Sequence, residues 1–362
     1  MASSIGKNIK LTIFGQSHSA AIGMVLEGIP AGLEIDFQAV SKFMARRAPG
    51  RDPWSTPRKE SDAPEVISGL LDGVTCGAPL CAIIRNSNTD SSAYASVKEV
   101  FRPGHADFTA QMKFHGFQDV SGGGHFSGRL TAPLVFAGAI CAQALRNQGI
   151  TIGAHISRIG TVSDDAFDPV GLTCDELTAP SKKRFPTISD DAGSAMAELI
   201  ASIRAQRDSV GGIVECAALG LPAGIGSPMF DGIENSIARI MFGIPAVKGI
   251  EFGAGFAVGG MRGSENNDPF EPGENRITTN SNNAGGILGG ISTGSPIVFR
   301  VAIKPTPSIA LEQCSVTVEG APAICAVKGR HDPCIVPRAV PVVEAACAFA
   351  LYDLILDSRL DS

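Results

Sequence analysis

The chain has 362 residues, of which 44% are hydrophobic, and its formal net charge is −6. This length and apolar content suffice for a large buried core, arranged in one large domain or in two. The acidic balance and the absence of any tract of lysine and arginine argue against nucleic acid or an acidic membrane surface as a partner.

The first predicted elements are two strands and a helix. Apolar and polar residues alternate over 9–15, and an apolar run follows over 22–26, which predicts two strands with His18 between them. Asp36 is expected to cap a helix that runs to about Arg47.

Two apolar runs flank residues 72–77, which predicts a strand, a turn and a second strand between residues 65 and 86. Gly122-Gly123-Gly124 precede an alanine-rich stretch that predicts a buried helix from Pro133 to Leu145, and glycines before a helix start favour an anion site. Further helices are expected near residues 190–207, 232–242 and 341–356, and strands near 211–219 and 296–303.

Basic residues gather in one short stretch of this acidic chain. They are Lys42, Arg46, Arg47, Arg51, Arg58 and Lys59. A local positive site for a small anionic ligand is one interpretation. The other is a solvated loop whose arginines pair with Asp52, Glu60 and Asp62.

The nine cysteines include no Cys-x-x-Cys pair. Five have the apolar or small neighbours that are typical of buried thiols, namely Cys76, Cys81, Cys141, Cys216 and Cys325. We therefore expect a reducing, cytoplasmic setting. The first residues lack the apolar core of a signal peptide, and the uncharged run over 277–299 is rich in glycine, serine and asparagine, so neither secretion nor membrane spanning is predicted.

Three short segments each combine a histidine with glycine and a second polar group: Gly15–His18, Arg102–Asp107 and Gly329–Cys334. If they converge, they supply imidazoles that exchange protons near neutral pH, carboxylates, and guanidinium groups for an anion. Taken singly, each imidazole could equally cap a turn. His115 and His155 are expected to be ordinary surface or core residues.

Two loops in the second half suit a ligand. The glycine pairs over 282–292 would let a flat ring or a phosphate approach the backbone, although glycine-rich runs are more often simple turns. Lys304–Ser308 offers one cation and two hydroxyls on a backbone stiffened by proline, which suits a phosphate but also a turn at a strand exit.

Taken together, these motifs resemble the chorismate synthase family in identity and order over nearly the whole chain. The matching segments are Gly15–His18 and residues 46–50, 102–107, 122–129, 244–249, 283–292, 304–308 and 330–344. Residues 330–341 are the most specific segment, because so long a string of unusual residues is improbable by chance.

The resemblance implies an enzyme of the shikimate pathway, which leads to the aromatic amino acids. Such an enzyme uses reduced FMN to remove phosphate and a proton from 5-enolpyruvylshikimate 3-phosphate by 1,4-anti elimination, which gives chorismate. It also implies one α+β domain over residues 1–362, with helices sandwiched between antiparallel sheets, a homotetramer and a cytoplasmic location. Whether such a chain reduces its own FMN with NAD(P)H or depends on another reductase stays open.

The resemblance assigns roles to individual residues. His18 matches the histidine near the leaving phosphate, His105 the histidine beside flavin N1 and O2, and Asp332 the acceptor of the N5 proton. The substrate contacts it implies are Ser17, Arg47, Arg102, Ser127, Arg129 and Arg330. The FMN contacts it implies are His125, Phe126, Ser127, Pro245, Ala246, Gly289, Lys304, Pro305, Thr306, Pro307, Ser308 and Arg330.

Several positions depart from the family pattern. Gln16 stands where the family has glutamate, Pro53 where it often has arginine, and residues 125–130 lose one arginine, one serine and one glutamate. The altered loop leaves open a catalytically degenerate paralogue that binds flavin or a shikimate-type phosphate. A flavin-independent phosphate lyase or phosphotransferase is a further alternative. No metal is expected, because no His, Asp and Glu group has the spacing of a ligand set.

Overall fold

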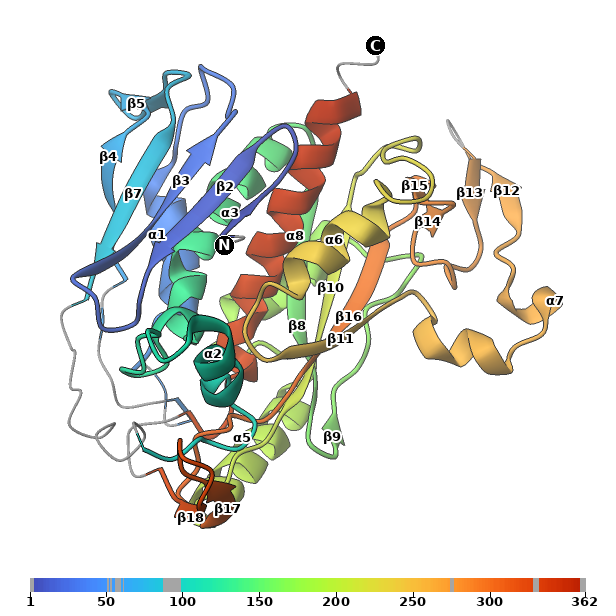
Figure 1. Ribbon diagram of the computed structural model, residues 1–362. Coiled ribbons are helices and arrows are strands. Elements are labelled where there is room, and N and C mark those ends of the chain that lie inside the picture. The colour runs from blue at the N-terminus through green and yellow to red at the C-terminus, as the bar shows by residue number, and fades with distance from the viewer. Residues whose placement is uncertain are drawn as a thin grey trace.

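The computed structural model describes residues 3–50, 52, 54–55, 60, 62–86, 99–273, 277–327 and 332–358. Two antiparallel sheets enclose a layer of helices (Figure 1). This confirms the predicted α+β class with helices between antiparallel sheets.

The first sheet has the strand order β1-β2-β3-β7-β4. Its strands are β1 (Ser4–Ile5), β2 (Lys10–Gly15), β3 (Ala21–Glu27), β7 (Leu80–Arg85) and β4 (Glu65–Ser68). Between β4 and β7 lies a small hairpin of β5 (Leu70–Leu71) and β6 (Val74–Thr75). The predicted strand pair is confirmed, and the turn between β2 and β3 carries His18.

The second sheet has the order β11-β16-β10-β8-β9. Its strands are β11 (Val247–Phe252), β16 (Ile297–Ile303), β10 (Gly212–Leu219), β8 (Thr151–Ile159) and β9 (Val162–Ser163). Three further hairpins are β12–β13 (Phe270–Pro272 and Ile277–Thr279), β14–β15 (Ile287–Leu288 and Ile291–Ser292) and β17–β18 (Gln313–Val316 and Pro322–Cys325).

The helices are α1 (Phe37–Arg47), α2 (Asp107–Phe114), α3 (Thr131–Arg146), α4 (Cys174–Thr178), α5 (Asp190–Ala205), α6 (Ile233–Met241), α7 (Gly263–Asn266) and α8 (Val336–Ser358). Short 3₁₀ turns are η3 (Gly124–Phe126), η4 (Gly128–Leu130), η5 (Ala179–Lys182) and η6 (Gly255–Gly260). The Asp36 side chain caps α1 as expected, because its Oδ1 accepts from Ala39 N at 3.0 Å.

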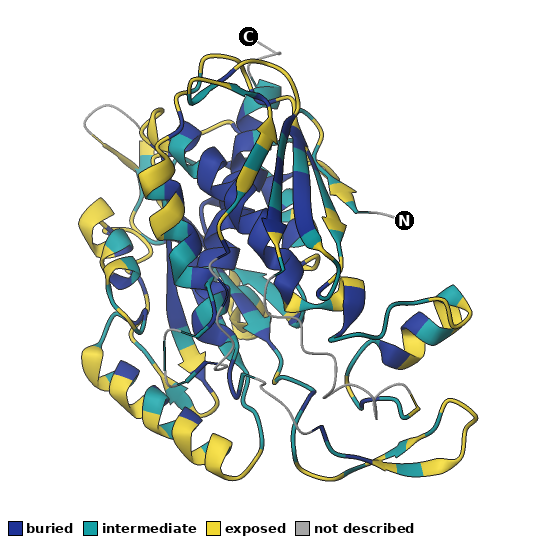
Figure 2. Cartoon of the chain, turned by 90° about the vertical axis from the view of Figure 1, so that its left-hand side faces the viewer, coloured by how far each residue is buried: buried dark blue, intermediate teal, exposed yellow. Residues whose placement is uncertain are grey.

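Helices α3 and α8 form the centre of the molecule. Helix α3 packs on the first sheet, α8 packs on the second, and the two helices pack on each other. A Cβ at Gly138 of α3 would lie 2.3 Å from the carbonyl oxygen of Ala345, so glycine there permits the close crossing. Figure 2 shows the buried residues concentrated in this layer.

Two helical stretches, residues 128–146 and α8, are long and apolar enough to cross a membrane by length and composition alone. In each, however, 83% of the most apolar window is buried inside the fold. Both helical stretches are therefore buried to the extent that is typical of core helices.

The structure corrects three expectations. Helix α8 begins at Val336 rather than near Pro341. Pro341 cannot donate a backbone hydrogen bond, but the burial of the helix between α3 and the second sheet stabilises it in spite of this loss. The turns η3 and η4 separate the glycines 122–124 from α3, so these glycines do not form its start. Cys76 is exposed beside the β5–β6 hairpin and Cys81 is half-buried, whereas Cys141, Cys216 and Cys325 are buried as predicted; all nine cysteines are free.

His155 of β8 is fully buried between two carboxylates. Its Nδ1 lies 3.1 Å from Asp164 Oδ2 and its Nε2 lies 2.9 Å from Glu215 Oε2, while Arg300 lies 3.8 Å from the other Glu215 oxygen. Burial alone would lower the pKa of His155, but the hydrogen bonds to Asp164 and Glu215 outweigh it and raise the pKa. His155 is therefore a core residue whose hydrogen bonds favour the protonated imidazole.

This arrangement predicts a pH-dependent stability. A raised pKa in the folded state stabilises the fold fully below the unfolded pKa of about 6.5, and this contribution is lost as the pH rises through the folded value. We expect His155→Gln to lower the free energy of unfolding by about 3 kcal/mol near pH 6, because it removes the positive charge between two buried carboxylates, and by less at alkaline pH. Urea unfolding at pH 6 and pH 9 measures the difference, with the exposed His115→Gln as control. A pH-independent effect would contradict this assignment.

Candidate active site

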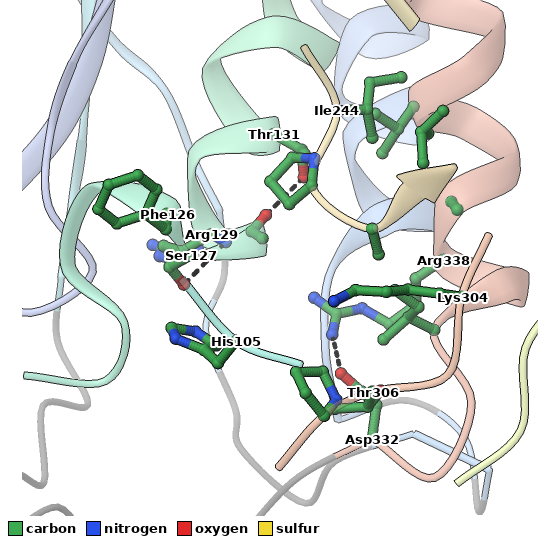
Figure 3. Close-up of a pocket in the computed structure, with 18 of the residues that line it drawn as sticks. His105, Phe126, Ser127, Arg129, Thr131, Ile244, Lys304, Thr306, Asp332 and Arg338 are labelled. Carbon is green, nitrogen blue, oxygen red and sulfur yellow. Dashed lines mark hydrogen bonds and ion pairs between the residues drawn. The ribbon is translucent and has the colours of Figure 1, made fainter. Parts of the chain in front are cut away.

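A cavity of about 650 Å³ opens between the end of α1, the start of α3, β11 and the start of α8. Its wall comes from segments that lie far apart in the sequence, including residues 102–106, 122–131, 242–248 and 304–308. In Figure 3, His105, Ser127 and Arg129 lie on one side of it, and Lys304, Thr306 and Arg338 lie on the other. Of the three histidine-bearing segments, residues 102–106 and Asp332 line the cavity, and the turn that carries His18 lies against the lining residue Gly122.

Most predicted site residues line this cavity. They are Arg47, Arg102, His105, His125, Phe126, Ser127, Arg129, Pro245, Ala246, Lys304, Thr306, Pro307, Ser308 and Asp332. Ser17 and His18 lie directly behind the wall, against Gly122. Pro305 and Gly289 do not line the cavity; Gly289 lies in the β14–β15 hairpin. Arg330 falls outside the described residues.

Glycines 122 and 123 separate the two predicted catalytic histidines. A Cβ at Gly122 would lie 2.1 Å from His18 Cε1, and a Cβ at Gly123 would lie 3.2 Å from His105 Nε2. Both glycines have positive φ, at 64° and 116°. The backbone of this loop can therefore run between the two imidazoles only because it carries no side chains there.

Hydrogen bonds tie the glycine loop to the turn that carries His18. Ser17 N donates to the carbonyl of Gly124 at 3.1 Å, and Ser17 Oγ donates to the carbonyl of Ser121 at 2.9 Å. The Nδ1 of His125 lies 3.1 Å from the carbonyl oxygen of Gly15. Ser17 Oγ also lies 3.0 Å from Nδ1 of His18, so the predicted substrate residue Ser17 contacts the imidazole directly.

Arg47 and Arg129 share one buried carboxylate. Asp62, whose side chain has no exposed surface, pairs with Arg47 through one oxygen and with Arg129 through the other. Arg47 also donates from Nε to Thr131 at 3.1 Å and from Nη2 to the carbonyl of Gly128 at 2.9 Å. Arg129 pairs in addition with Glu60. The two guanidinium groups are thus held side by side in the wall.

The electrostatics of this pair follow from burial. Burial, together with the positive charges of Arg338 and Arg129, lowers the pKa of Arg47 to about 10 against the opposing effect of Asp62. Burial alone would raise the pKa of Asp62, but Arg47 and Arg129 outweigh it and lower the pKa. Arg47 and Asp62 are therefore both charged at neutral pH. The cluster offers N–H donors to an anion, while the carboxylates of Asp62 and Glu60 balance most of the positive charge of the two arginines. Of the two interpretations of the basic stretch at residues 42–59, pairing of an arginine with a nearby acid therefore holds for Arg47.

A second pair lies at the start of α8. Arg338 donates from Nη1 to Asp332 Oδ2 at 2.7 Å and from Nε to the carbonyl of Arg47 at 3.0 Å. Arg338 therefore connects the predicted proton acceptor to the end of α1 (Figure 3).

Two lysine side chains line the opposite side of the cavity. Lys304 donates to the carbonyl of Gly104, and Lys248 on β11 also lines the cavity. Partial burial and the charge of Lys248 lower the pKa of Lys304. Beside them, the buried Oγ1 of Thr306 has no hydrogen-bond partner among the described residues. Two cations and an unpartnered hydroxyl at one place suit a phosphate group.

Sequence reasoning missed several residues of this site. Lys248 and Arg338 lie within the motifs at 244–249 and 330–341, and their basic side chains are the sequence feature that could have identified them as site residues. Asp62 was noticed only as a nearby acid. Its bridge to Arg129, 67 positions away, has no signal in the sequence, because it depends on the packing of α1 against the start of α3.

Chemically, the cavity combines anion-binding guanidinium groups, a phosphate-binding corner, two imidazoles and a carboxylate in one partly enclosed space. Groups of this kind can bind a multiply charged small molecule and move protons to and from it. Within the residues that the structure describes, no group of three or more His, Cys, Asp and Glu side chains could hold a metal ion.

Comparison with known proteins is consistent with this site. The family model described as chorismate synthase matches residues 9–356. Proteins named chorismate synthase from Lancefieldella parvula and Dehalococcoides mccartyi are each 45% identical to this chain; the matches cover 98% of it and 96% and 97% of those proteins. One from Thermococcus gammatolerans is 46% identical and covers 97% of each chain. A crystal structure of chorismate synthase superposes with a TM-score of 0.78 at 26% identity, covering 98% of this chain and 93% of that one.

Proposed function

The chain belongs to the chorismate synthase family of shikimate-pathway lyases, and we propose that it removes phosphate and a proton from 5-enolpyruvylshikimate 3-phosphate to give chorismate, with reduced FMN as cofactor. The observation that carries this proposal is that residues 102–106 and Asp332 line one cavity of about 650 Å³, with His18 directly behind its wall at Gly122. A cavity of this size is within the range that holds a small ligand, and its basic lining suits two anionic molecules.

The residues present fit FMN. The corner formed by Lys304, Lys248 and Thr306 offers charge and an unpartnered buried hydroxyl to its phosphate. The apolar side chains of Phe126 and Ile244 border the cavity and suit a flat ring. When bound, reduced FMN supplies transient electron density that helps the phosphate depart, and it takes up the hydrogen from C6 of the substrate.

The protein's own groups orient the substrate and handle protons. Arg47 and Arg129 would hold the carboxylate or phosphate oxygens of the substrate, with Ser127 as a further donor. His18 would donate a proton or hydrogen bond to the departing phosphate. His105 would hydrogen-bond the N1 and O2 side of the flavin, and Asp332 would accept the proton at N5. Arg102, Arg330 and the remaining predicted contacts keep the roles that the resemblance implies.

We also propose that residues 1–362 form one domain that acts in the cytoplasm as a homotetramer. Exposed apolar side chains near α6 and the edge strand β11 support association of copies. They are Met229, Phe230, Phe242, Phe256 and Val258, with Phe256 88% exposed. The molar mass in solution tests the assembly.

The FMN assignment is tested at Lys304. We expect Lys304→Met to weaken FMN binding about 10- to 100-fold, because it removes a charge-assisted hydrogen bond while keeping the length of the side chain. Titration of FMN followed by flavin fluorescence measures this change. The exposed Lys10→Met on β2 is the control and should bind FMN like the wild type. Equal affinities for the two variants would remove Lys304 from the FMN site.

A further inference from the structure

The carboxylate of Asp107 is saturated by hydrogen bonds from its own segment. Asp107 is the first residue of α2, and its side chain is 9% exposed. Its Oδ2 accepts from Arg102 Nε at 2.7 Å and from Arg102 N at 3.0 Å. Its Oδ1 accepts from Arg102 Nη2 at 2.7 Å and lies 2.6 Å from His105 Nδ1. Asp107 does not line the cavity, whereas Arg102 and His105 do.

The protonation state of Asp107 decides what His105 Nδ1 does. Burial alone would raise the pKa of Asp107, but the hydrogen bonds from Arg102 and His105 outweigh it and hold the pKa well below its ordinary value. An ionised carboxylate can only accept hydrogen bonds. At 2.6 Å from it, Nδ1 of His105 must therefore carry a hydrogen. Arg102 Nη2 also lies 3.1 Å from Nδ1, but it donates to Asp107 Oδ1 at 2.7 Å, and an Nδ1 without hydrogen would set its lone pair against that carboxylate oxygen at 2.6 Å.

The other ring nitrogen of His105 faces a different environment. Its Nε2 is directed toward Gly123, where a Cβ would lie 3.2 Å away, and the ring borders the cavity with 15% of its side chain exposed. Figure 3 shows the ring below Ser127, on the side of the cavity opposite Lys304. Because Nδ1 is occupied by Asp107, only Nε2 can gain or lose a proton without breaking the buried hydrogen bonds.

We propose that Asp107 is a positioning residue that fixes His105 in the tautomer with its hydrogen on Nδ1, so that His105 exchanges protons with bound ligands through Nε2 alone. The assignment of this proton exchange to bound flavin rests on the proposed function. The tautomer itself follows from the contact with Asp107 and does not depend on that function. Arg102 belongs to the same unit: two of its guanidinium nitrogens are committed to Asp107, and Nη1, 3.4 Å from Ser308 Oγ, is the one left toward the cavity.

The tautomer is measured by long-range ¹H–¹⁵N NMR of the full chain at pH 8, without flavin or substrate, with the His105 signals assigned from His105→Gln. We expect wild-type His105 to show a protonated Nδ1 and an unprotonated Nε2. Asp107→Asn keeps the shape of the side chain but places an amide donor among the donors of Arg102 and His105, and should populate the tautomer with hydrogen on Nε2. Asp190→Asn, the same change at the first position of α5, where the exposed carboxylate pairs with Lys183, should leave the His105 signals unchanged.

Activity supplies the second readout. In Asp107→Asn we expect kcat to fall about 100-fold or more, with a much smaller change in the FMN dissociation constant, because a histidine in the wrong tautomer is chemically unsuited while the pocket keeps its shape. A wild-type His105 with hydrogen on Nε2 alone and none on Nδ1 would overturn the proposal even if the variant does not fold, and so would an unchanged tautomer in the variant. Because the spectra contain no flavin, a chain that fails to turn over substrate would count against the proposed function and leave this result standing.

Discussion

Gly122→Ala should lower turnover by about 100-fold or more while leaving FMN binding nearly intact. A Cβ at this position would lie 2.1 Å from Cε1 and 2.4 Å from Nδ1 of His18, so the imidazole has to move. A displacement of a catalytic group by about 1 Å can cost about 100-fold in rate. Because Gly122 has a φ of 64°, the variant should also lose about 1 kcal/mol of stability.

Two controls separate displacement of His18 from backbone strain. Gly149 also has a positive φ, 82°, but a Cβ there would have no atom within 4 Å, so Gly149→Ala should cost similar stability and leave turnover unchanged. In a His18→Ala background, Gly122→Ala should add little further loss, because the group that it displaces is already absent. Additive losses in that double variant would show that Gly122 acts through something other than His18.

Asp62→Asn should reduce the free energy of unfolding by about 3 to 5 kcal/mol, because it leaves two buried guanidinium groups without their shared counter-charge. Asparagine has the same shape and tolerates the left-handed backbone of this residue, whose φ is 49°, so the change removes charge without adding backbone strain. The affinity for the anionic substrate should also fall, since the carboxylate that joins Arg47 to Arg129 is then lost.

Urea unfolding at pH 7 and substrate titration of the FMN-loaded protein measure the two effects. The control is Glu65→Gln, which removes an exposed ion pair with Arg85 at 3.3 Å and should change stability by about 0.5 kcal/mol or less. The pKa of Asp62 is lowered in the folded protein, so its contribution is present above the ordinary aspartate range and is lost as the pH falls through the folded value. A variant as stable as the control would contradict the bridging role of Asp62.

Much of the local structure could be predicted, because it depends on neighbours in the sequence. The Asp36 cap, the β2–β3 pair and the body of α3 follow from patterns that span a few residues. The start of α8 could not, since Pro341 marks a helix start by local rules, and only burial between a sheet and α3 explains why the helix begins earlier.

The same distinction holds for the site. The segments that line the cavity could be named from their residue types, and most of the named side chains lie there. Asp62 could be named as a nearby acid for Arg47, but the contacts of Asp62 with Arg129 and of Arg338 with the carbonyl of Arg47 form only in the folded chain. The sequence predicts only that the glycines at 122 and 123 precede a helix, whereas in the folded chain they make room for His18 and His105.

The altered loop at residues 125–130 has its own structural consequence. His125 lines the cavity and also contacts the carbonyl of Gly15, and the aromatic ring of Phe126 forms part of the cavity wall. These contacts keep the glycine loop attached to the turn that carries His18. The loop is therefore held beside the turn that carries His18 by contacts of its own, although its side chains differ from the family pattern.

The most direct test of the proposed function is anaerobic turnover of 5-enolpyruvylshikimate 3-phosphate by the purified chain with dithionite-reduced FMN, following chorismate absorbance and phosphate release. We predict that both products form at equal rates, and only when FMN and reductant are present. Phosphate release without flavin would point to a flavin-independent lyase or phosphotransferase. Binding of FMN and substrate without chorismate formation would identify a degenerate paralogue and contradict the proposed reaction.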